Sequence, residues 1–300
     1  MSHRPGDESP LMARLIEAAR AHDEAALALL KDRATLDPDR VHDLRVTVKR
    51  LRALWRLMGT QGPRKLADKQ DKRLRAAAAS LSGARDLQVM GETLAALRAT
   101  SRRDYEKEAL DRVRELALPA GGDPAVTPEK PADLEKTFLE DRDRWTDLKV
   151  EGDDGTLIKK GVGRVYAHTR RLGFEAIAED QPETWHGFRK WVKYLLYQLE
   201  PIAGPLENSD IPLKELRKLG KKLGDLHDLH VLDEFLRQAR KKTDDKEPFG
   251  HARQLIGRRE SALVNDCEKR ARGAFVLKPK VFREAMGQVK DKDAGGETST

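Results

Sequence analysis

The sequence has little of three things on which many proteins depend. It has one cysteine, Cys267, in 300 residues, which excludes a disulfide framework and a cysteine-based zinc site. Aromatic residues make up only 5% of the chain. No apolar run approaches the roughly 18 residues of a membrane-spanning helix. The first ten residues, MSHRPGDESP, also lack the apolar core of a secretion signal. We therefore expect a cytoplasmic protein with no membrane span.

Charge, in contrast, is abundant. Lysine and arginine total 58 against 51 aspartates and glutamates, so that 36% of the chain is charged and the net charge is +7. An average soluble domain is roughly 25% charged. Because acids and bases can share one solvated surface, the net charge alone identifies no partner. The positions of the basic residues along the chain are more informative.

The apolar residues follow a helical pattern. They recur at spacings of three and four between proline and glycine breaks, without alternating runs of β-branched residues, which predicts an all-α protein. Asp37-Pro38 is typical of a helix start and Gly59 of a helix end. The predicted helices cover 10–33, 38–58, 64–82, 85–118, 132–149, 157–180, 182–202, 212–243, 250–273 and 278–290. Composition predicts three flexible segments, a disordered N-terminus 1–10, a linker 119–131 and a disordered tail 291–300.

The chain contains an internal repeat. A shift of 144 residues aligns the helix after Pro38 with the helix after Pro182. The identical pairs in this helix are Pro38/Pro182, His42/His186, Arg45/Arg189, Val48/Val192, Lys49/Lys193 and Leu51/Leu195. A shift of 142 then aligns the next helices, pairing Leu74, Leu81 and Asp86 with Leu216, Leu223 and Asp228. We interpret the chain as a duplication, with one helical repeat at 11–149 and another at 155–290 that together form one domain.

The repeated helix carries a basic stripe beside its apolar side. At about 100° per residue, Leu44, Val48 and Trp55 fall on the side that would pack into a core, whereas the basic residues follow a 3-4-3-4 spacing elsewhere. The stripe consists of His42, Arg45, Lys49, Arg52 and Arg56, and its second copy of His186, Arg189 and Lys193, with Tyr197 near the same direction. A merely solvating face would tolerate swaps such as Lys for Glu, so the repetition favours a functional stripe.

Neighbouring helices add further basic residues. The helix after Pro212 contains one acid, Glu215, among five cations, Lys214, Arg217, Lys218, Lys221 and Lys222. Its counterpart in the first repeat contributes Arg75, and the helix that begins near residue 157 contributes Arg164 and Arg170. Cations on several neighbouring helices would line a groove for a polyanion.

Three stretches resemble the duplicated motifs of the CHAD family, the conserved histidine α-helical domain. They are VHDLRVTVKRLRALWRL at 41–57, WHGFRKWVKYLLYQLEPI at 185–202 and LGDLHDLHVL at 223–232, and LSGARDLQV at 81–89 is similar to the matching element of the first repeat. The resemblance implies two four-helix-type bundles related by a pseudo-twofold axis, with a basic groove or pore that binds inorganic polyphosphate. The chain departs from the family at Leu196, where Arg is usual, and at His227, where Asn or Arg is usual.

Physical chemistry agrees with a polyphosphate ligand. Polyphosphate offers only oxygen acceptors, which arginine binds with a planar fork and lysine as a point charge. Histidines beside the polyanion would gain donors when its charge raises their pKa. We therefore predict a protein that binds polyphosphate and other polyanions without catalysis and without a cofactor or metal. Such a protein could associate with polyphosphate granules. The predicted phosphate-binding residues are His42, Arg45, Lys49, Arg52, Arg56, Arg75, Arg164, Arg170, His186, Arg189, Lys193, Tyr197, Lys214, Arg217, Lys218, Lys221 and Lys222.

Three alternatives use the same features. Nucleic acid presents similar phosphates, but its single-strand binders usually add aromatic stacking platforms, and aromatics are scarce here. A metal-dependent phosphohydrolase would use His-Asp pairs such as His42-Asp43, yet Asp43 aligns with Gly187 in the second repeat. A module that tethers other proteins to polyphosphate would carry the same groove as a simple binder.

Overall fold

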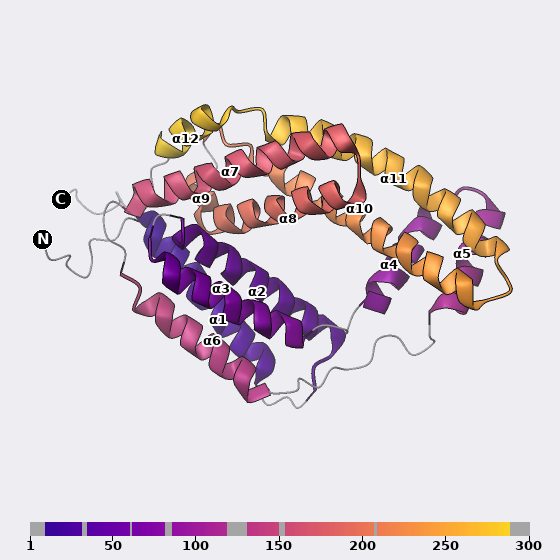
Figure 1. Cartoon of the computed structure of the whole chain (residues 1–300), viewed down its shortest axis with the longest axis horizontal. Helices are drawn as coiled ribbons and strands as arrows, with labels where there is room; N and C mark the ends of the chain where they lie inside the picture. The colour runs from indigo at the N-terminus through magenta and orange to yellow at the C-terminus, as the bar shows by residue number, and fades with distance from the viewer. Residues whose placement is uncertain are drawn as a thin grey trace, which may run out of the picture.

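The computed structural model describes residues 10–31, 35–60, 62–81, 86–118, 131–149, 154–206 and 209–288. In these ranges every regular element is a helix, which confirms the all-α prediction (Figure 1). The α-helices are α1 (Pro10–Leu30), α2 (Pro38–Met58), α3 (Arg64–Ser80), α4 (Asp86–Thr100), α5 (Asp104–Ala117), α6 (Pro131–Thr146), α7 (Asp154–Glu179), α8 (Pro182–Leu199), α9 (Ala203–Leu206), α10 (Leu213–Ala239), α11 (Glu247–Ala274) and α12 (Pro279–Gln288). Short 3₁₀ helices, Glu200–Ile202 and Arg240–Lys242, follow α8 and α10. The expected flexible segments lie outside the described residues, apart from Pro10 and Pro131, which begin α1 and α6.

Helices α1, α2, α3 and α6 form a four-helix bundle (Figure 1). Helix α1 packs against α2 and α6, and α3 packs against the same two helices from the other side. The indole rings of Trp55 and Trp145 meet in its core with centroids 4.0 Å apart. Both indole nitrogens donate to the buried carboxylate of Asp141, over 2.9 and 3.2 Å. Burial of the apolar side of α2 leaves its basic stripe on the outside of the bundle.

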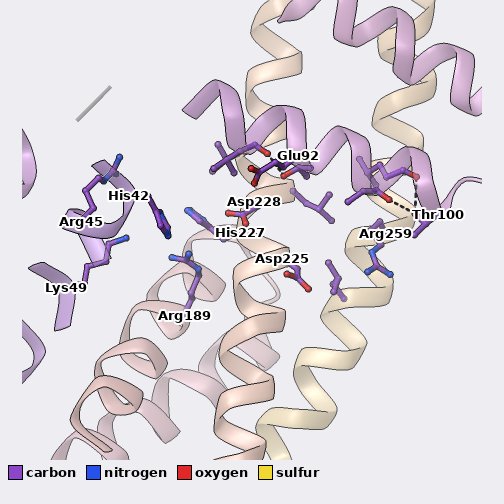
Figure 2. A pocket seen from close by; sticks show the side chains of 17 residues that line it. His42, Arg45, Lys49, Glu92, Thr100, Arg189, Asp225, His227, Asp228 and Arg259 are labelled. Atoms are coloured by element: carbon purple, nitrogen blue, oxygen red, sulfur yellow. Dashed lines mark hydrogen bonds between the residues drawn. The ribbon is translucent and has the colours of Figure 1, made fainter. Parts of the chain in front are cut away.

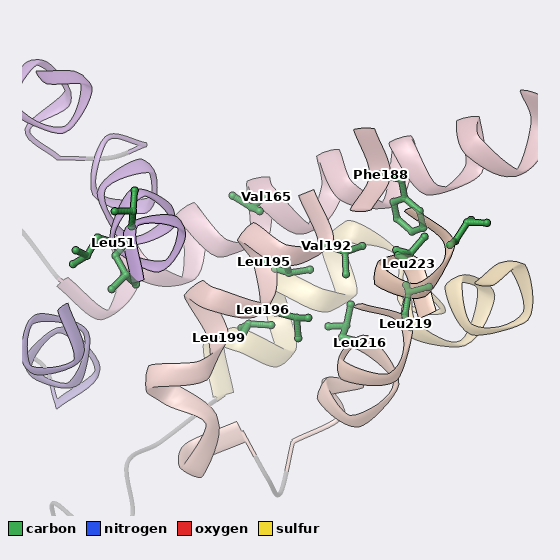
Figure 3. Packing of buried hydrophobic residues seen from close by; sticks show 14 of the residues in the cluster. Leu51, Val165, Phe188, Val192, Leu195, Leu196, Leu199, Leu216, Leu219 and Leu223 are labelled. Carbon is green, nitrogen blue, oxygen red and sulfur yellow. The ribbon is translucent and has the colours of Figure 1, made fainter. Parts of the chain in front are cut away.

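Helices α7, α8, α10, α11 and α12 form the second group. Helix α7 packs on α8 and α12, α8 packs on α10, and α10 packs along α11. Leucines of α8 and α10 interlock with Phe188 and Val192, which are fully buried (Figure 3). A Cβ atom at Gly173 of α7 would lie 2.8 Å from two ring carbons of Phe188, so glycine is what allows this close approach. Cys267 is buried in the same core.

The prediction of one helix over 85–118 was wrong, because the structure has two. Thr100 and Ser101 bond back through their hydroxyls to the carbonyl oxygen of Leu97 (3.0 and 2.9 Å), which competes with continuation of α4. Arg103 is extended, and Asp104 and Glu106 supply the acidic first turn that favours a new helix. The chain therefore turns back on itself between α4 and α5.

Helices that the sequence alignment equates also contact each other. Helix α2 packs on α8, and the α4–α5 pair packs on α10 and α11. One hydrophobic core accordingly runs through both predicted repeats. The duplication and its pseudo-twofold axis stay predictions from the sequence. Among the described helices, none is both long and apolar enough to cross a lipid bilayer.

Candidate functional site

The basic face of α2 is set by how this helix starts and packs. The carboxylate of Asp37 accepts a hydrogen bond from the backbone nitrogen of Arg40 (2.9 Å), which caps the helix where the sequence predicts its start. Val41, Leu44 and Val48 are fully buried. Their burial turns the predicted stripe, with Lys49 near its middle, away from the bundle core.

Helix α8 holds a second basic face opposite the first. Ala53 of α2 packs with Tyr194 and Tyr197 of α8, and the side-chain nitrogen of Gln198 donates to the carbonyl oxygen of Ala53 over 2.9 Å. These contacts fix the two helices side by side. Tyr197 is consequently buried between them, where the guanidinium of Arg50 lies 5.7 Å from its ring centre.

A cavity of about 540 Å³ opens at the end of this helix pair, between α2, α8, α4, α10 and α11. Cations from α2 and α8 line one side of it, namely Arg45, Lys49 and Arg189, together with His42. Carboxylates of α4 and α10 lie farther along, namely Glu92, Asp225 and Asp228, followed by Arg259 of α11 (Figure 2). The cavity is therefore not uniformly basic.

The cations of α2 and α8 are crowded together. Partial burial, and after it the charges of Arg189, Arg45 and Lys193 in that order, lowers the pKa of Lys49 to about 8. Burial and the neighbouring Arg189 also lower the pKa of Lys193. The Nε atom of Arg189 is buried with no hydrogen-bond partner among the described residues. An anion that enters such a cluster lowers its free energy, because it offsets the repulsion between the cations and accepts their hydrogen bonds.

Two histidines meet beside these cations. The Nδ1 atoms of His186 and His227 lie 3.3 Å apart, so one ring donates a hydrogen bond to the other. Burial, and after it the charge of Arg189, lowers the pKa of both, to about 4 for His227. Both rings are therefore largely neutral at pH 7 until a bound anion raises their pKa.

Arg52 and Arg56 form a different arrangement. Both donate to the carboxylate of Asp71 on α3, with shortest distances of 2.9 and 3.1 Å, and Arg56 also lies 4.6 Å from the ring centre of Tyr194. Asp71 thus neutralises part of their charge. Exposed Arg75 of α3 extends this face. Burial, and after it the charges of Arg56, Arg52 and Arg75, lowers the pKa of Lys190 on α8.

Of the predicted residues, only His42, Arg45, Lys49 and Arg189 line the cavity, and those of α7 and α10 lie away from it. Arg164 and Arg170 of α7 donate to the backbone oxygens of Thr60 (2.9 Å) and Phe275 (3.1 Å). On α10, Lys218 pairs with Glu215 and Lys222 with Asp266, whereas Lys214, Arg217 and Lys221 are exposed and have no ion pair among the described residues. Their roles as phosphate donors stay predictions.

The sequence prediction omitted residues that the structure brings to the site. Lys190 follows His186 by four residues, so the helical spacing could have placed it in the stripe. Arg259 and the carboxylate of Glu92 carried no such signal, because only the packing of α4 beside α11 brings them to the cavity. Among the described residues, no three His, Cys, Asp or Glu side chains are placed to hold a metal ion.

Comparison with known proteins identifies the family. The CHAD domain model matches residues 11–237, and the chain belongs to the CHAD family. Among solved structures, it is similar to the CHAD domain from the plant Ricinus communis, with 15% identity, a TM-score of 0.47, and coverage of 97% of this chain and 96% of that one. No curated protein matches the chain.

Proposed function

We propose that this chain binds inorganic polyphosphate, without catalysis, through the facing basic surfaces of α2 and α8. The observation that carries the proposal is the cluster of Lys49, Arg189 and Lys193. Burial, and after it the charge of Arg189, lowers the pKa of both lysines, and the Arg189 Nε has no acceptor among the described residues. Phosphate oxygens would supply the missing acceptors and the missing negative charge. Membership of the CHAD family supports the same ligand class.

The extent of the basic surface favours a chain of phosphates over a single phosphate. Beyond the cluster, the charge of Arg75 on α3 reaches Lys190 of α8, and α10 carries three further exposed cations, Lys214, Arg217 and Lys221. A long polyanion that lies across several helices displaces many counterions at once. A protein with this surface would also be held on polyphosphate granules in the cytoplasm.

The aromatic residues favour polyphosphate over nucleic acid. Trp191 and Tyr194 pack edge to face with their ring centres 5.6 Å apart, and Tyr194 is buried. Base stacking needs an exposed ring face. The aromatics nearest the basic cluster are therefore committed to packing between helices.

Charge reversal of the cluster tests the proposal. Lys49→Glu/Lys193→Glu should weaken polyphosphate binding about tenfold or more, because charged hydrogen bonds to phosphate are lost. The matched control is Lys136→Glu/Lys280→Glu, which changes the net charge equally on α6 and α12, away from the cavity. Equal affinities for the two variants, with unchanged circular dichroism, would contradict the proposal.

The absence of catalysis has its own test. We expect no phosphate release when the protein is incubated with polyphosphate and Mg²⁺ or Mn²⁺. Release that rises with protein concentration and is abolished by Asp228→Asn would show an enzyme instead.

A further inference from the structure

A second cavity lies at the turn between α4 and α5. It measures about 450 Å³, and α11 closes its other side. Four arginines and one acid line it, namely Arg102, Arg103, Arg258, Arg259 and Glu106. The repeated stripe of α2 and α8 contributes nothing to this cavity, so its basic character is a separate feature of the molecule.

Two of these arginines have neither a hydrogen bond nor an ion pair within the described part of the chain. Glu106 is buried and accepts from Nη2 of Arg258 over 2.5 Å. Arg103 donates to the hydroxyl of Tyr105 over 3.0 Å. Within the described part of the chain, Arg102 and Arg259 have neither a hydrogen bond nor an ion pair, so their guanidinium forks are available to an anion.

The backbone at this turn adds to the positive potential. Helix α5 begins here, and its N-cap residue Arg103 makes no side-chain hydrogen bond to the first turn. The first backbone N–H groups of a helix have no partner within the helix and point toward its N-terminal end. Asp104, which would oppose an anion, pairs with Lys107 over 3.1 Å.

Carboxylates separate this cavity from the cations of α2 and α8. The two cavities share Leu97, Thr100 and Arg259. Between Arg259 and the cations of α2, however, lie the carboxylates of Glu92 and Asp225 (Figure 2). A polyanion seated among the α2 and α8 cations is repelled at these carboxylates. The geometry therefore favours two anion sites over one continuous channel.

We propose that the cavity at the α4–α5 turn is a second binding site for the phosphate groups of polyphosphate, with Arg102, Arg103, Arg258 and Arg259 as donors. This inference rests on the proposed function of the α2–α8 surface. One long chain that reaches both sites would bind more tightly than a short one, because the second contact becomes intramolecular.

Titration calorimetry with tripolyphosphate tests the second site. We expect the unaltered protein to bind two tripolyphosphates, and Arg102→Ser/Arg103→Ser, which spares the first cavity, to bind one. Lys49→Ser/Lys193→Ser should also bind one, at the arginine site. Arg272→Ser is the matched control on α11, since Arg272 pairs with Glu268 and lines neither cavity. For long-chain polyphosphate, we expect the Arg102/Arg103 variant to lose about tenfold in affinity.

Three other results would contradict the proposal of a second site. One tripolyphosphate on the unaltered protein, together with none on the Lys49/Lys193 variant, would leave the proposed function standing and remove the second site. No binding to any variant would overturn both. If a single-stranded RNA oligomer bound the Lys49/Lys193 variant and tripolyphosphate did not, the arginine cavity would be a nucleic-acid site.

Discussion

At the scale of single residues, surroundings set the charge that each titratable group carries. Lys49 has its pKa lowered to about 8 by partial burial and neighbouring cations, and His227 has its pKa lowered to about 4 for the same reasons. Burial, and after it the charge of nearby Asp141, raises the pKa of Asp23 to about 9. Burial also raises the pKa of Asp141, to about 6, but the indole donors of Trp55 and Trp145 oppose this rise, which leaves the proton of the pair on Asp23. Two predictions follow from these groups.

The first concerns the pH dependence of binding. A bound polyanion raises the pKa of His227, so a proton is taken up and the affinity increases as the pH falls from 8 toward 5. His227→Asn cannot take up this proton and should show a weaker pH dependence. Dissociation constants measured at pH 5, 6.5 and 8 check this. An identical pH dependence in both proteins would contradict the role given to the His186–His227 pair.

The second concerns stability. Both carboxyl oxygens of Asp23 are buried, and neither has a hydrogen-bond partner among the described residues. The pKa of Asp23 is higher in the folded protein than in the unfolded chain. Its contribution to the free energy of unfolding is therefore largest below about pH 4 and is lost as the pH rises toward 9. Asn stays neutral throughout. We expect Asp23→Asn to raise the free energy of unfolding by about 1–3 kcal/mol at pH 8 and by little at pH 4.

Urea unfolding at both pH values measures this difference. Asp244→Asn, an exposed aspartate beyond α10, serves as the control for the loss of one charge. A stability gain that is equal at pH 4 and pH 8 would show that Asp23 does not hold a proton in the folded protein.

At the scale of helices, close approaches position the basic faces. Helix α7 supports α8, and their contact at Gly173 leaves no room for a Cβ atom beside Phe188. Gly187, by contrast, lies on α8 with nothing within 4 Å of where its Cβ atom would be. These two glycines therefore offer a matched pair of substitutions in neighbouring helices.

Gly173→Ala should destabilise the protein by about 1–3 kcal/mol, because the rigid Phe188 ring and its buried surroundings must shift. Gly187→Ala should stabilise it by about 0.5–1 kcal/mol, since alanine is the better helix former and meets no neighbour. Thermal unfolding of the two variants measures both changes. Equal shifts of one sign would contradict the packing described between α7 and α8.

The sequence predicts some features of the helices and not others. Helical periodicity was sufficient to locate the apolar side of α2, and Val48 and Trp55 are buried as predicted. The break between α4 and α5 was missed, because hydroxyl groups bonded back to the helix, and neither glycine nor proline, end α4. Cavity residues such as Arg259 and Glu92 depend on contacts between distant helices, which periodicity within one helix does not specify.

At the scale of the whole molecule, the arrangement of charge matters more than its sum. The net charge of +7 conceals a cluster of cations between α2 and α8, carboxylates beyond it, and four arginines at the α4–α5 turn. Several basic regions on one molecule favour an extended polyanion as ligand. Because such binding releases counterions, its strength depends steeply on salt concentration.

A salt titration of polyphosphate binding, with RNA of equal charge as competitor, tests the central claim most directly. We predict that affinity falls by roughly a hundredfold or more between about 50 and 200 mM salt, and that polyphosphate displaces the RNA at every salt concentration. RNA that displaces polyphosphate, or an affinity that does not change with salt, would contradict the account.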